Sequence, residues 1–532
     1  MSVAASESRT DDRAAGRIVS SLIDGQPVAP QTSQPTASYN PARVEERVAL
    51  ARLGDGDTFV DAARTARAAQ RGWAATPAPR RGRAIQQIGR IVEANKETLA
   101  RLITREIGKP LAEARGEVQE VIDTCDFFLG EGRRLYGQTV PSEMPDKQLF
   151  TFRVPVGAAA IITAGNFPVA VPAWYLVPAL LCGNSVSWKP AEYTPAIADA
   201  FTRLFLAGGL PPGVLNMVLC DGPATERGLR TALDVGLVDK VGFTGSSDVG
   251  VRIGELCGRH LQSPCLELGG KNPLVVMPDA DLELAVEGAL FSGFGTAGQR
   301  CTSLGAVIVH DSICDEFLSR FAAATQQAAI GDPMQAVLYG PMMSRRFAAR
   351  FEIWLELIRG HHTVHGSSGI GQITRANPRA GFIGDPELGL FYHPTIVAGV
   401  DADDELYRTE TFGPIVAVTR FETFDEAIDL ANGHGYGLSA AIYTRDARNA
   451  FRFRERVSAG MVSVNNSTSG AEAHLPFGGN GRSGNGSRLS GVWVLDQFTR
   501  WQALNWDYAG KLQKAQMDIE DVQAELDFRL EP

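Results

Sequence analysis

Cys301 is a candidate nucleophile. It stands in the segment FGTAGQRCTS, behind a glycine-rich turn that contains Gly293, Gly295 and Gly298. Because glycine has no Cβ, the backbone of such a turn can approach a ligand closely. A cysteine taken alone is more often buried filler than a nucleophile. The assignment therefore depends on which other groups lie beside this thiol.

Glu267 and Asn166 could supply the base and the hydrogen-bond donor that such a thiol needs. Glu267 lies in LELGGKNP, at the expected end of a strand, and partial burial there would raise its pKa towards that of a general base. Asn166 lies in TAGNFPVAVPAW, between an apolar strand and a helix start. Its carboxamide is a suitable donor to an oxyanion. The alternatives are a surface glutamate on a turn and an asparagine that caps a helix.

A further segment, KVGFTGSSDVGVRI, predicts an anion site. A strand ends at Gly245, and Ser246 opens a helix whose free N–H groups would face a phosphate. The spacing G-x-x-x-x-G is weaker evidence than the dinucleotide pattern G-x-G-x-x-G. That literal pattern occurs at Gly479, Gly481 and Gly484, with no strand directly before it, and we interpret it as a chance match in a glycine-rich loop.

These residues need parallel strands to position them. Short apolar runs alternate with helical segments from Phe150 onward, and a second such series begins at Gly305. This alternation is typical of parallel βαβ units buried on both faces, so the predicted fold class is α/β with two such domains. Before these units, residues 59–73 and 83–107 carry apolar positions at three- and four-residue spacings, which predict helices.

The two ends of the chain carry different patterns. Residues 1–17 have no apolar signal core and mix acids with arginines, which predicts a disordered tail and no targeting peptide. From Leu512 to Leu526, apolar residues recur at spacings of 3, 4, 3 and 4, which predicts a helix. This helix would cover its own domain or pack against a partner subunit. Residues 360–385 are rich in Gly, His and Ser and predict an exposed loop.

Composition excludes several classes of protein. A chain of 532 residues is expected to form two or three domains. The net charge of -10 argues against a nucleic-acid partner. The seven cysteines form no CxxC pair and the histidines no HExxH, so no disulfide framework and no metal site are expected, and a cytoplasmic location fits best. Prolines and asparagines interrupt the most apolar stretch, 154–188, so no membrane span is expected.

Together the motifs resemble those of the NAD(P)-dependent aldehyde dehydrogenase superfamily, from about Ile18 to Gln513. The matching segments, in chain order, are GNFP, KPAEYTP, LELGGKNP, GQRCTS, ETFGPIVAV, and PFGG before a glycine-rich stretch. Several independent motifs in one order are far more specific than any single motif. The resemblance implies a Rossmann-type cofactor domain, an α/β catalytic domain and a small β element that joins subunits into a homodimer or homotetramer.

The resemblance also implies domain boundaries. They are 18–146 and 158–267 for the NAD-binding domain, 268–493 for the catalytic domain, 147–157 and 494–513 for the oligomerisation element, and 514–532 for a C-terminal helical extension.

The same resemblance implies roles for the three residues introduced first. Cys301 would attack an aldehyde as a thiolate, while the Asn166 side chain and the Cys301 backbone N–H hold the oxyanion. Hydride would leave the thiohemiacetal for the nicotinamide, and Glu267 would activate the water that hydrolyses the resulting thioester.

Cofactor contacts follow from the resemblance as well. Lys189 and Glu192 match positions that hold the adenosine ribose, and Glu410 and Phe412 match those that hold the nicotinamide ribose and ring. A carboxylate at Glu192 favours the 2′-OH of NAD over the 2′-phosphate of NADP, so NAD is the predicted cofactor and NADP stays open. The complete predicted set is Thr163, Lys189, Glu192, Gly245, Ser246, Glu410 and Phe412.

Two positions depart from the family pattern. Many relatives carry lysine where this chain has Tyr175, and Arg-Glu where Ser487 and Arg488 stand. That lysine and glutamate help to relay protons from the general base, so the relay is in doubt here. The C-terminal segments resemble most the bacterial and archaeal branch with 2-oxoglutarate semialdehyde dehydrogenases, which implies a semialdehyde acid as substrate.

Candidate substrate residues lie next to these motifs. Arg300 could pair with a substrate carboxylate, because a guanidinium binds carboxylates in a bidentate manner; alternatively it hydrogen-bonds loop carbonyls. Phe167, Val171, Trp174 and His474 are candidate tunnel-lining residues, or plain core. Two other functions compete with hydrolytic aldehyde oxidation. One is a CoA-acylating dehydrogenase, whose relatives typically lack the glutamate of LELGGK, and the other is a non-catalytic protein on the same scaffold.

Overall fold

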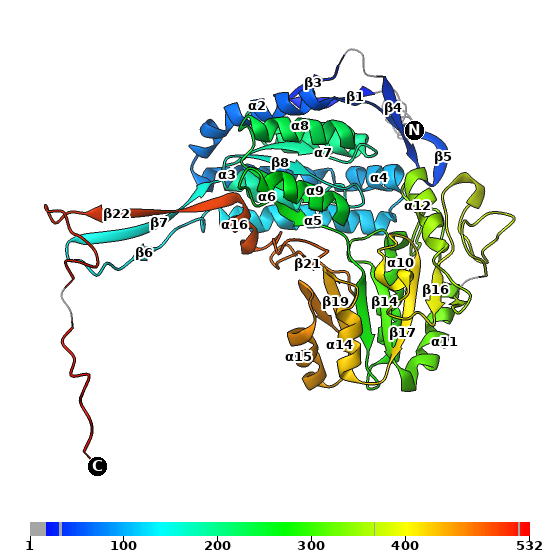
Figure 1. The fold of residues 1–532 in the computed structure, drawn as a ribbon. Helices are drawn as coiled ribbons and strands as arrows, with labels where there is room; N and C mark the ends of the chain where they lie inside the picture. Colours follow the sequence, from blue (N-terminus) through cyan, green and yellow to red (C-terminus); the bar gives the residue numbers. More distant parts are fainter. Residues whose placement is uncertain (1–17, 31–33, 367, 520–521, 532) are drawn as a thin grey trace, which may run out of the picture.

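The chain folds into two lobes and a thin arm (Figure 1). The computed structural model describes residues 18–30, 34–366, 368–519 and 522–531. The tail predicted for residues 1–17 lies outside them. Each lobe is built on a seven-stranded sheet, and the arm is a three-stranded sheet that projects from the first lobe.

The sheet of the first lobe has the order β12-β11-β8-β9-β10-β2-β3. The strands from β12 to β10 are parallel, while β2 and β3 add antiparallel to one edge. The central strands are uninterrupted buried runs, such as AAAII in β8 and SVSWK in β9, because helices cover both faces (Figure 1). The strand bounds are β2 Ser21–Ile23, β3 Gln26–Val28, β8 Ala158–Ile162, β9 Ser185–Lys189, β10 Leu215–Met217, β11 Lys240–Thr244 and β12 Cys265–Glu267.

Eight helices belong to the described part of this lobe. The helix predicted over 59–73 is α2, which begins where the Asp55 carboxylate accepts the N–H of Thr58 at 2.9 Å. The segment 83–107 does not form one helix, because the chain breaks at Asn95. The bounds are α2 Gly56–Ala74, α3 Ala78–Ala94, α4 Lys96–Ile107, α5 Leu111–Glu131, α6 Ala170–Leu181, α7 Pro195–Ala207, α8 Gly222–Asp234 and α9 Ser247–Gly258.

Residues near the N-terminus form a small separate sheet of order β1-β5-β4. Its strands are β1 Ile18–Val19, β4 Pro35–Asn40 and β5 Arg43–Arg52. The antiparallel pair β4–β5 was not expected from the sequence, since its residues alternate only weakly between buried and exposed positions.

The sheet of the second lobe has the order β15-β16-β17-β14-β13-β19-β20. All neighbours are parallel except β15 and β16. Its strands are β13 Asn272–Val276, β14 Leu304–His310, β15 Thr363–His365, β16 Thr395–Ala398, β17 Ile415–Phe421, β19 Ser439–Tyr443 and β20 Met461–Val464. Its helices are α10 Leu282–Phe294, α11 Asp311–Gln327, α12 Arg345–Leu355, α13 Glu405–Arg408, α14 Phe424–Asn432 and α15 Ala447–Arg456, with 3-10 turns at Gly295–Gly298 and Pro386–Leu388.

A glycine-rich segment returns from the second lobe to the first. Its short strand β21 (Asn480–Gly481) pairs with β18 (Tyr436–Gly437), and Figure 1 shows β21 between the lobes. The segment is tied to the first sheet, since Leu268 N donates to Ser483 O at 3.0 Å and Asn485 Nδ2 donates to Pro264 O at 2.8 Å. The G-x-G-x-x-G match thus falls in a connection between lobes and not in a strand–turn–helix unit.

The arm consists of β7 (Lys147–Pro155) between β6 (Thr139–Val140) and β22 (Thr499–Asp507). β7 and β22 pair antiparallel along their whole length, from Lys147 opposite Asp507 to Pro155 opposite Thr499. A 3-10 turn, Val492–Val494, and the short helix α16, Leu495–Phe498, lead into β22. The arm therefore joins two segments that lie far apart in the sequence.

The helix predicted within 514–532 is wrong. The described residues after Asp507 form turns and irregular chain, and Leu512 and Leu526 are more than four-fifths exposed. An isolated helix of this length is marginal in water, and its apolar positions have no surface of this chain to pack on. Among the described residues, no helix is long and apolar enough to cross a membrane.

Candidate active site

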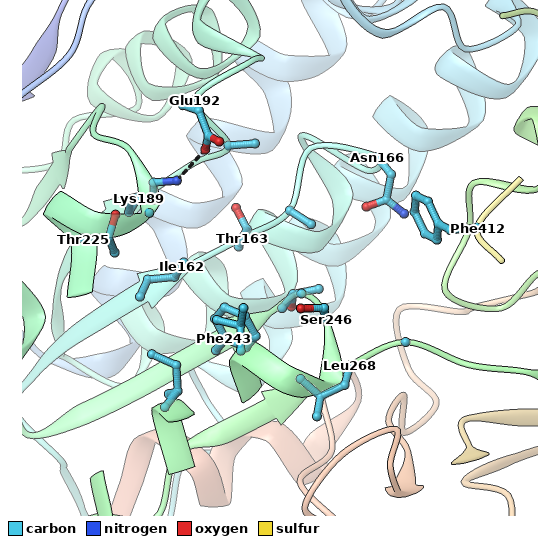
Figure 2. A pocket seen from close by; sticks show the side chains of 18 of the residues that line it. Ile162, Thr163, Asn166, Lys189, Glu192, Thr225, Phe243, Ser246, Leu268 and Phe412 are labelled. Carbon is cyan, nitrogen blue, oxygen red and sulfur yellow. Dashed lines mark hydrogen bonds and ion pairs between the residues drawn. The ribbon is translucent and has the colours of Figure 1, made fainter. Parts of the chain in front are cut away.

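A cavity of about 570 Å³ lies where the carboxyl ends of the first sheet meet the second lobe. Parallel α/β sheets bind ligands at this edge. Thr163 and Gly245 directly follow β8 and β11, Lys189 is the last residue of β9, and Cys301 and Glu410 reach the same cavity from the second lobe. Figure 2 shows Lys189 and Glu192 at one side of the cavity and Asn166 and Phe412 at the other.

One side of the cavity carries an ion pair. Lys189 Nζ lies 2.9 Å from Glu192 Oε2 (Figure 2), and the exposed Arg346 lies 3.5 Å from the other carboxylate oxygen. Burial tends to raise the pKa of Glu192, but Lys189 outweighs this and holds the pKa below its ordinary value. A stable carboxylate therefore faces the site predicted for the adenosine ribose.

The predicted anion site is a helix N-terminus that opens into the cavity. Ser246 is the N-cap of α9, with extended backbone, and Gly245 and Ser246 both line the cavity. The first N–H groups of α9 are thus available to a negatively charged group. Thr225, at the start of α8, lines the same region and had no motif that would have identified it.

Cys301 is presented by a strained turn. Thr296 and Ala297 adopt left-handed backbone with φ of 52° and 55°, a conformation that costs free energy and persists only where packing enforces it. At Gly298, with φ of +68°, a Cβ would lie 2.1 Å from the carbonyl oxygen of Gly413, so glycine is required. The backbone after this turn is fixed, because Asn272 Nδ2 donates to Cys301 O at 2.8 Å.

Asn166 and Cys301 line the same cavity. Asn166 Nδ2 donates to Gln299 O at 3.0 Å, and the Gln299 side chain in turn accepts the N–H of Met343 at 2.9 Å. The Asn166 carboxamide is thus held against the backbone of Gln299, which stands two positions before Cys301 in the chain. Burial, and then the charges of Glu267 and Glu410, raise the pKa of the Cys301 thiol to about 12, so the resting thiol is protonated and needs activation.

Glu267 ends β12 and is buried, with 2% exposure. Its backbone carbonyl accepts the N–H of Gly245 at 3.1 Å, while neither carboxyl oxygen has a hydrogen-bond partner among the described residues. Burial raises its pKa well above the ordinary value of 4.5, and the charge of Arg488, followed by the backbone N–H of Gly479, acts in the opposite direction. Glu267 does not line the cavity, but its charge acts on the Cys301 thiol.

Glu410 and Phe412 form the wall contributed by the second lobe. Glu410 Oε1 accepts the N–H of Gly270 at 3.2 Å, and burial raises its pKa to about 7. A Cβ on Gly269 would meet this carboxylate at 1.9 Å, which explains the glycine. Phe412 has a left-handed backbone with φ of 45°, and its ring lies 5.8 Å from that of Phe347 on α12.

The prediction that Arg300 binds a substrate carboxylate is wrong for this structure. Arg300 Nη2 lies 2.5 Å from Glu113 Oε2, and the guanidinium packs 4.5 Å from the Phe291 ring centroid. The side chain is 7% exposed and does not line the cavity. Glu113 lies 187 residues earlier in the chain, and no motif marks it as the partner.

The remaining candidate substrate residues lie outside the cavity lining. The Trp174 ring lies 4.6 Å from that of Phe477, and Lys109 Nζ lies 3.5 Å from the Phe167 ring centroid. Val171 is buried with them. His474 is exposed, with Nε2 3.3 Å from Glu472, so it does not line a tunnel within this chain. A tunnel role for the buried Val171 and Trp174 and the half-buried Phe167 stays a prediction.

One group of metal-ligating residue types lies together in the described residues: His361, His362 and Asp404. His362 Nδ1 accepts the N–H of Arg359 at 2.9 Å, so the ring proton stands on Nε2, which faces Asp404 Oδ2 at 3.1 Å. A nitrogen that carries this proton donates to the carboxylate and does not ligate a cation. We therefore interpret the group as a hydrogen-bonded cluster.

The fold and the position of the cavity are those of an α/β protein that binds a ligand at the carboxyl ends of a parallel sheet. Residues 28–504 match the model of the aldehyde dehydrogenase family. The chain is 36% identical to the alpha-ketoglutarate semialdehyde dehydrogenase of Haloferax volcanii, over 90% of this chain and 96% of that one. It is 36% identical to the alpha-aminoadipic semialdehyde dehydrogenase of Bos taurus, over 90% and 87%. Betaine aldehyde dehydrogenase from Staphylococcus aureus in complex with NAD+ superposes with a TM-score of 0.88 at 28% identity, over 95% and 98%.

The chain therefore belongs to the aldehyde dehydrogenase family. The predicted family, the α/β fold class and the prediction of an enzyme that oxidises aldehydes are confirmed.

Proposed function

We propose that this enzyme oxidises a semialdehyde that carries a carboxylate, with NAD, through a thioester on Cys301. The observation that carries the mechanism is a single cavity lined by both Cys301 and Asn166, into which the N-terminus of α9 also opens. The substrate class is supported by the relatives from Haloferax volcanii and Bos taurus, whose names both specify the semialdehyde of a carboxylic acid.

The residues of the cavity fit a dinucleotide. Ser246 and the α9 N-terminus would hold the pyrophosphate, Glu192 and Lys189 the adenosine ribose, and Glu410 and Phe412 the nicotinamide ribose and ring. Bound NAD supplies the acceptor for the hydride that the aldehyde carbon loses. The relative of known structure that carries NAD+ supports this choice of cofactor.

Cys301 and Asn166 would carry the first half of the reaction. The thiol loses its proton, its sulfur bonds to the aldehyde carbon, and the carbonyl oxygen becomes an oxyanion. The Asn166 carboxamide and the Cys301 N–H donate to that oxygen, and their positions are fixed before the substrate arrives, so no reorganisation is needed. Loss of the hydride from carbon leaves a thioester on the sulfur.

Glu267 would carry the second half. Water attacks the thioester carbon and gives its proton to the Glu267 carboxylate, the C–S bond breaks, and the electron pair returns to the Cys301 sulfur. The Glu267 carboxyl group then releases this proton to solvent before the next turnover, although burial raises its pKa well above 4.5 and so makes it hold the proton more tightly than an exposed glutamate does. The raised pKa also makes the carboxylate a stronger base than an exposed glutamate.

A substrate screen tests the proposed function. Purified enzyme is assayed for NADH formation with semialdehyde acids of several lengths, with the matching neutral aldehydes, and with aromatic aldehydes. We expect kcat/KM to be highest for a semialdehyde acid. A preference for neutral aldehydes would overturn the substrate class. Formation of acyl-CoA when CoA is added would instead favour the CoA-acylating alternative.

Replacing Glu192 with glutamine should relax the choice of cofactor. The carboxylate repels a 2′-phosphate, so its removal should raise the ratio of kcat/KM for NADP to that for NAD by about 10-fold. Steady-state kinetics with both cofactors measure this ratio. Glu316→Gln, on the surface of α11, removes a carboxylate far from the cavity and serves as the control. An unchanged ratio in Glu192→Gln would contradict the role of Glu192.

The arm supports a homodimer or homotetramer. β22 is an edge strand, and Leu504 and Trp506 on one face of it are 43% and 59% exposed. A long exposed edge with apolar side chains favours pairing with another strand. We propose that the partner is a second copy of this chain.

The cysteines bear on the compartment in which the enzyme works. The seven cysteines are free and six of them are buried, which fits a reducing cytoplasm.

Charges on β22 should dissociate the oligomer. Leu504 and Trp506 lie on one face of the strand, so the double variant Leu504→Glu/Trp506→Glu places two carboxylates there, and we expect the mass measured by light scattering to fall to that of one chain. Asn505→Glu adds a charge on the opposite face and should keep the wild-type mass. If the double variant keeps the wild-type mass, this face does not join subunits.

A further inference from the structure

The carboxyl group of Glu267 and the side chain of Arg488 border the same glycine. A Cβ on Gly478 would lie 2.5 Å from Glu267 Oε1 and 3.3 Å from Arg488 Cδ. Both oxygens of Glu267 lack a hydrogen-bond partner among the described residues. Within the described part of the chain the buried carboxyl group therefore has no ion-pair partner, and an arginine side chain borders the same backbone position.

The guanidinium of Arg488 is held by its own loop. Nη1 donates to Ser487 O at 2.9 Å and to Gly479 O at 3.3 Å, and Nη2 donates to Asn480 Oδ1 at 2.9 Å. These three acceptors are neutral, and no carboxylate of the described residues forms an ion pair with Arg488. Its effect on Glu267 is exerted through space, in surroundings where half-burial limits screening by water.

The other titratable groups that face Glu267 are neutral at neutral pH. Tyr175, from α6, donates its hydroxyl to Phe243 O at 3.1 Å, and burial keeps its pKa well above 10. Burial also raises the pKa of the Cys265 thiol, on β12, and of the Cys301 thiol to about 12 each. Among the described groups that act on Glu267, Arg488 alone supplies a charge that favours the carboxylate.

We propose that Arg488 is a positioning residue for thioester hydrolysis. Its guanidinium, fixed by the 478–488 loop beside Glu267, keeps enough of that buried carboxyl group ionised to take a proton from the attacking water. In this chain a cation stands where many relatives carry a glutamate, and a neutral tyrosine stands where they carry a lysine. Of these two positions, only residue 488, in the loop, carries a positive charge in this chain. This inference rests on the proposed function.

Two substitutions separate the charge from the loop contacts. Arg488→Gln keeps a side chain that can donate to the loop carbonyls but removes the charge, whereas Arg488→Lys keeps the charge. The Cys301 thiol is acetylated with 4-nitrophenyl acetate, and the decay of the acetyl-enzyme is followed by intact-protein mass spectrometry as a function of pH. This decay isolates hydrolysis from hydride transfer, so it reports on the base alone.

The expected result is a shift along the pH axis. Losing the cation should raise the midpoint of the decay rate in Arg488→Gln by about one to two pH units, so that decay at neutral pH is at least about 10-fold slower and recovers in alkali. Arg488→Lys should keep the wild-type midpoint to within about half a unit. An unshifted midpoint in Arg488→Gln, or an equal loss of rate at every pH in both variants, would overturn the proposal.

Two controls make the outcome specific. Arg482→Gln removes a cation from the same loop, at a residue that stacks 4.4 Å from the Tyr436 ring, and should not move the midpoint. In a Glu267→Gln background, Arg488→Gln should cause no further shift, since the titrating group is gone; a further shift would assign the midpoint to another group and overturn the proposal. Failure of the proposed function is distinguishable, because the wild-type enzyme would then form no acetyl-enzyme on Cys301.

Discussion

Replacing Cys301 with alanine will abolish aldehyde oxidation, with a loss in kcat of at least about 10⁴-fold. In the proposed mechanism the sulfur of Cys301 bonds to the aldehyde carbon, so without it no thiohemiacetal and no thioester form. NADH formation followed by absorbance measures the loss. The Asn166 carboxamide and the helix start remain, and binding of NAD should therefore be retained, as measured by calorimetry.

Cys314 offers a matched control for this substitution. It is a buried thiol on α11, in the core of the second lobe. Cys314→Ala removes the same atoms without touching the cavity and should keep kcat within about twofold, at some cost in thermal stability. Turnover that survives in Cys301→Ala would remove this residue from the chemistry.

Glu267→Gln will uncouple the two halves of the reaction. We expect a rapid burst of about one NADH per active site, followed by a steady state slower than wild type by about 10²- to 10⁴-fold. The burst persists because the negative charge of Glu267 is one of the causes that raise the thiol pKa. Its removal favours the thiolate. Stopped-flow absorbance measures both phases, and mass spectrometry should find the acyl group on Cys301.

The pH dependence of the wild-type enzyme follows from the same carboxyl group. Hydrolysis needs the ionised form, and burial raises the pKa of Glu267 above 4.5. Turnover limited by hydrolysis should therefore rise with pH on the acid side, with a midpoint well above 4.5, and this limb should be absent from Glu267→Gln. A burst-free Glu267→Gln enzyme with a normal steady state would assign hydrolysis to another base.

Part of the cofactor side of the site was predictable from the sequence, because Thr163, Lys189 and Gly245 stand at the ends of recognisable strands. Runs such as AAAII and SVSWK predict buried parallel strands, and the carboxyl ends of such strands meet at one edge. Thr163, Lys189 and Gly245 therefore had to lie close together. The structure brings them to one cavity, while their roles, like those of the catalytic residues, remain to be tested by the substitutions described above.

The other features of the site could not be predicted from the sequence, because they depend on contacts between segments far apart in the chain. The partner of Arg300 is Glu113, and nothing local to the QRCTS motif indicates that a glutamate on α5 lies there. Arg346 and Phe347 reach the cavity from the first turn of α12, whose sequence reads as an ordinary amphipathic helix. The helix predicted near the C-terminus was wrong for the opposite reason. Its apolar residues have helical spacing, but Leu512 and Leu526 remain exposed and do not pack on the rest of the chain.

The pairing of β7 with β22 also means that the arm cannot form until nearly the whole chain has been synthesised. Arg153 on β7 is 343 residues ahead of its ion-pair partner Asp496, which precedes β22. At a translation rate of about 5–20 residues per second, β22 is synthesised roughly 20–70 s after β7. Throughout that interval the nascent chain displays an open strand edge, which invites association with other nascent chains. Premature termination upstream of Thr499 would make the exposure permanent, so prematurely terminated products should be recovered in aggregates and the full-length protein in solution.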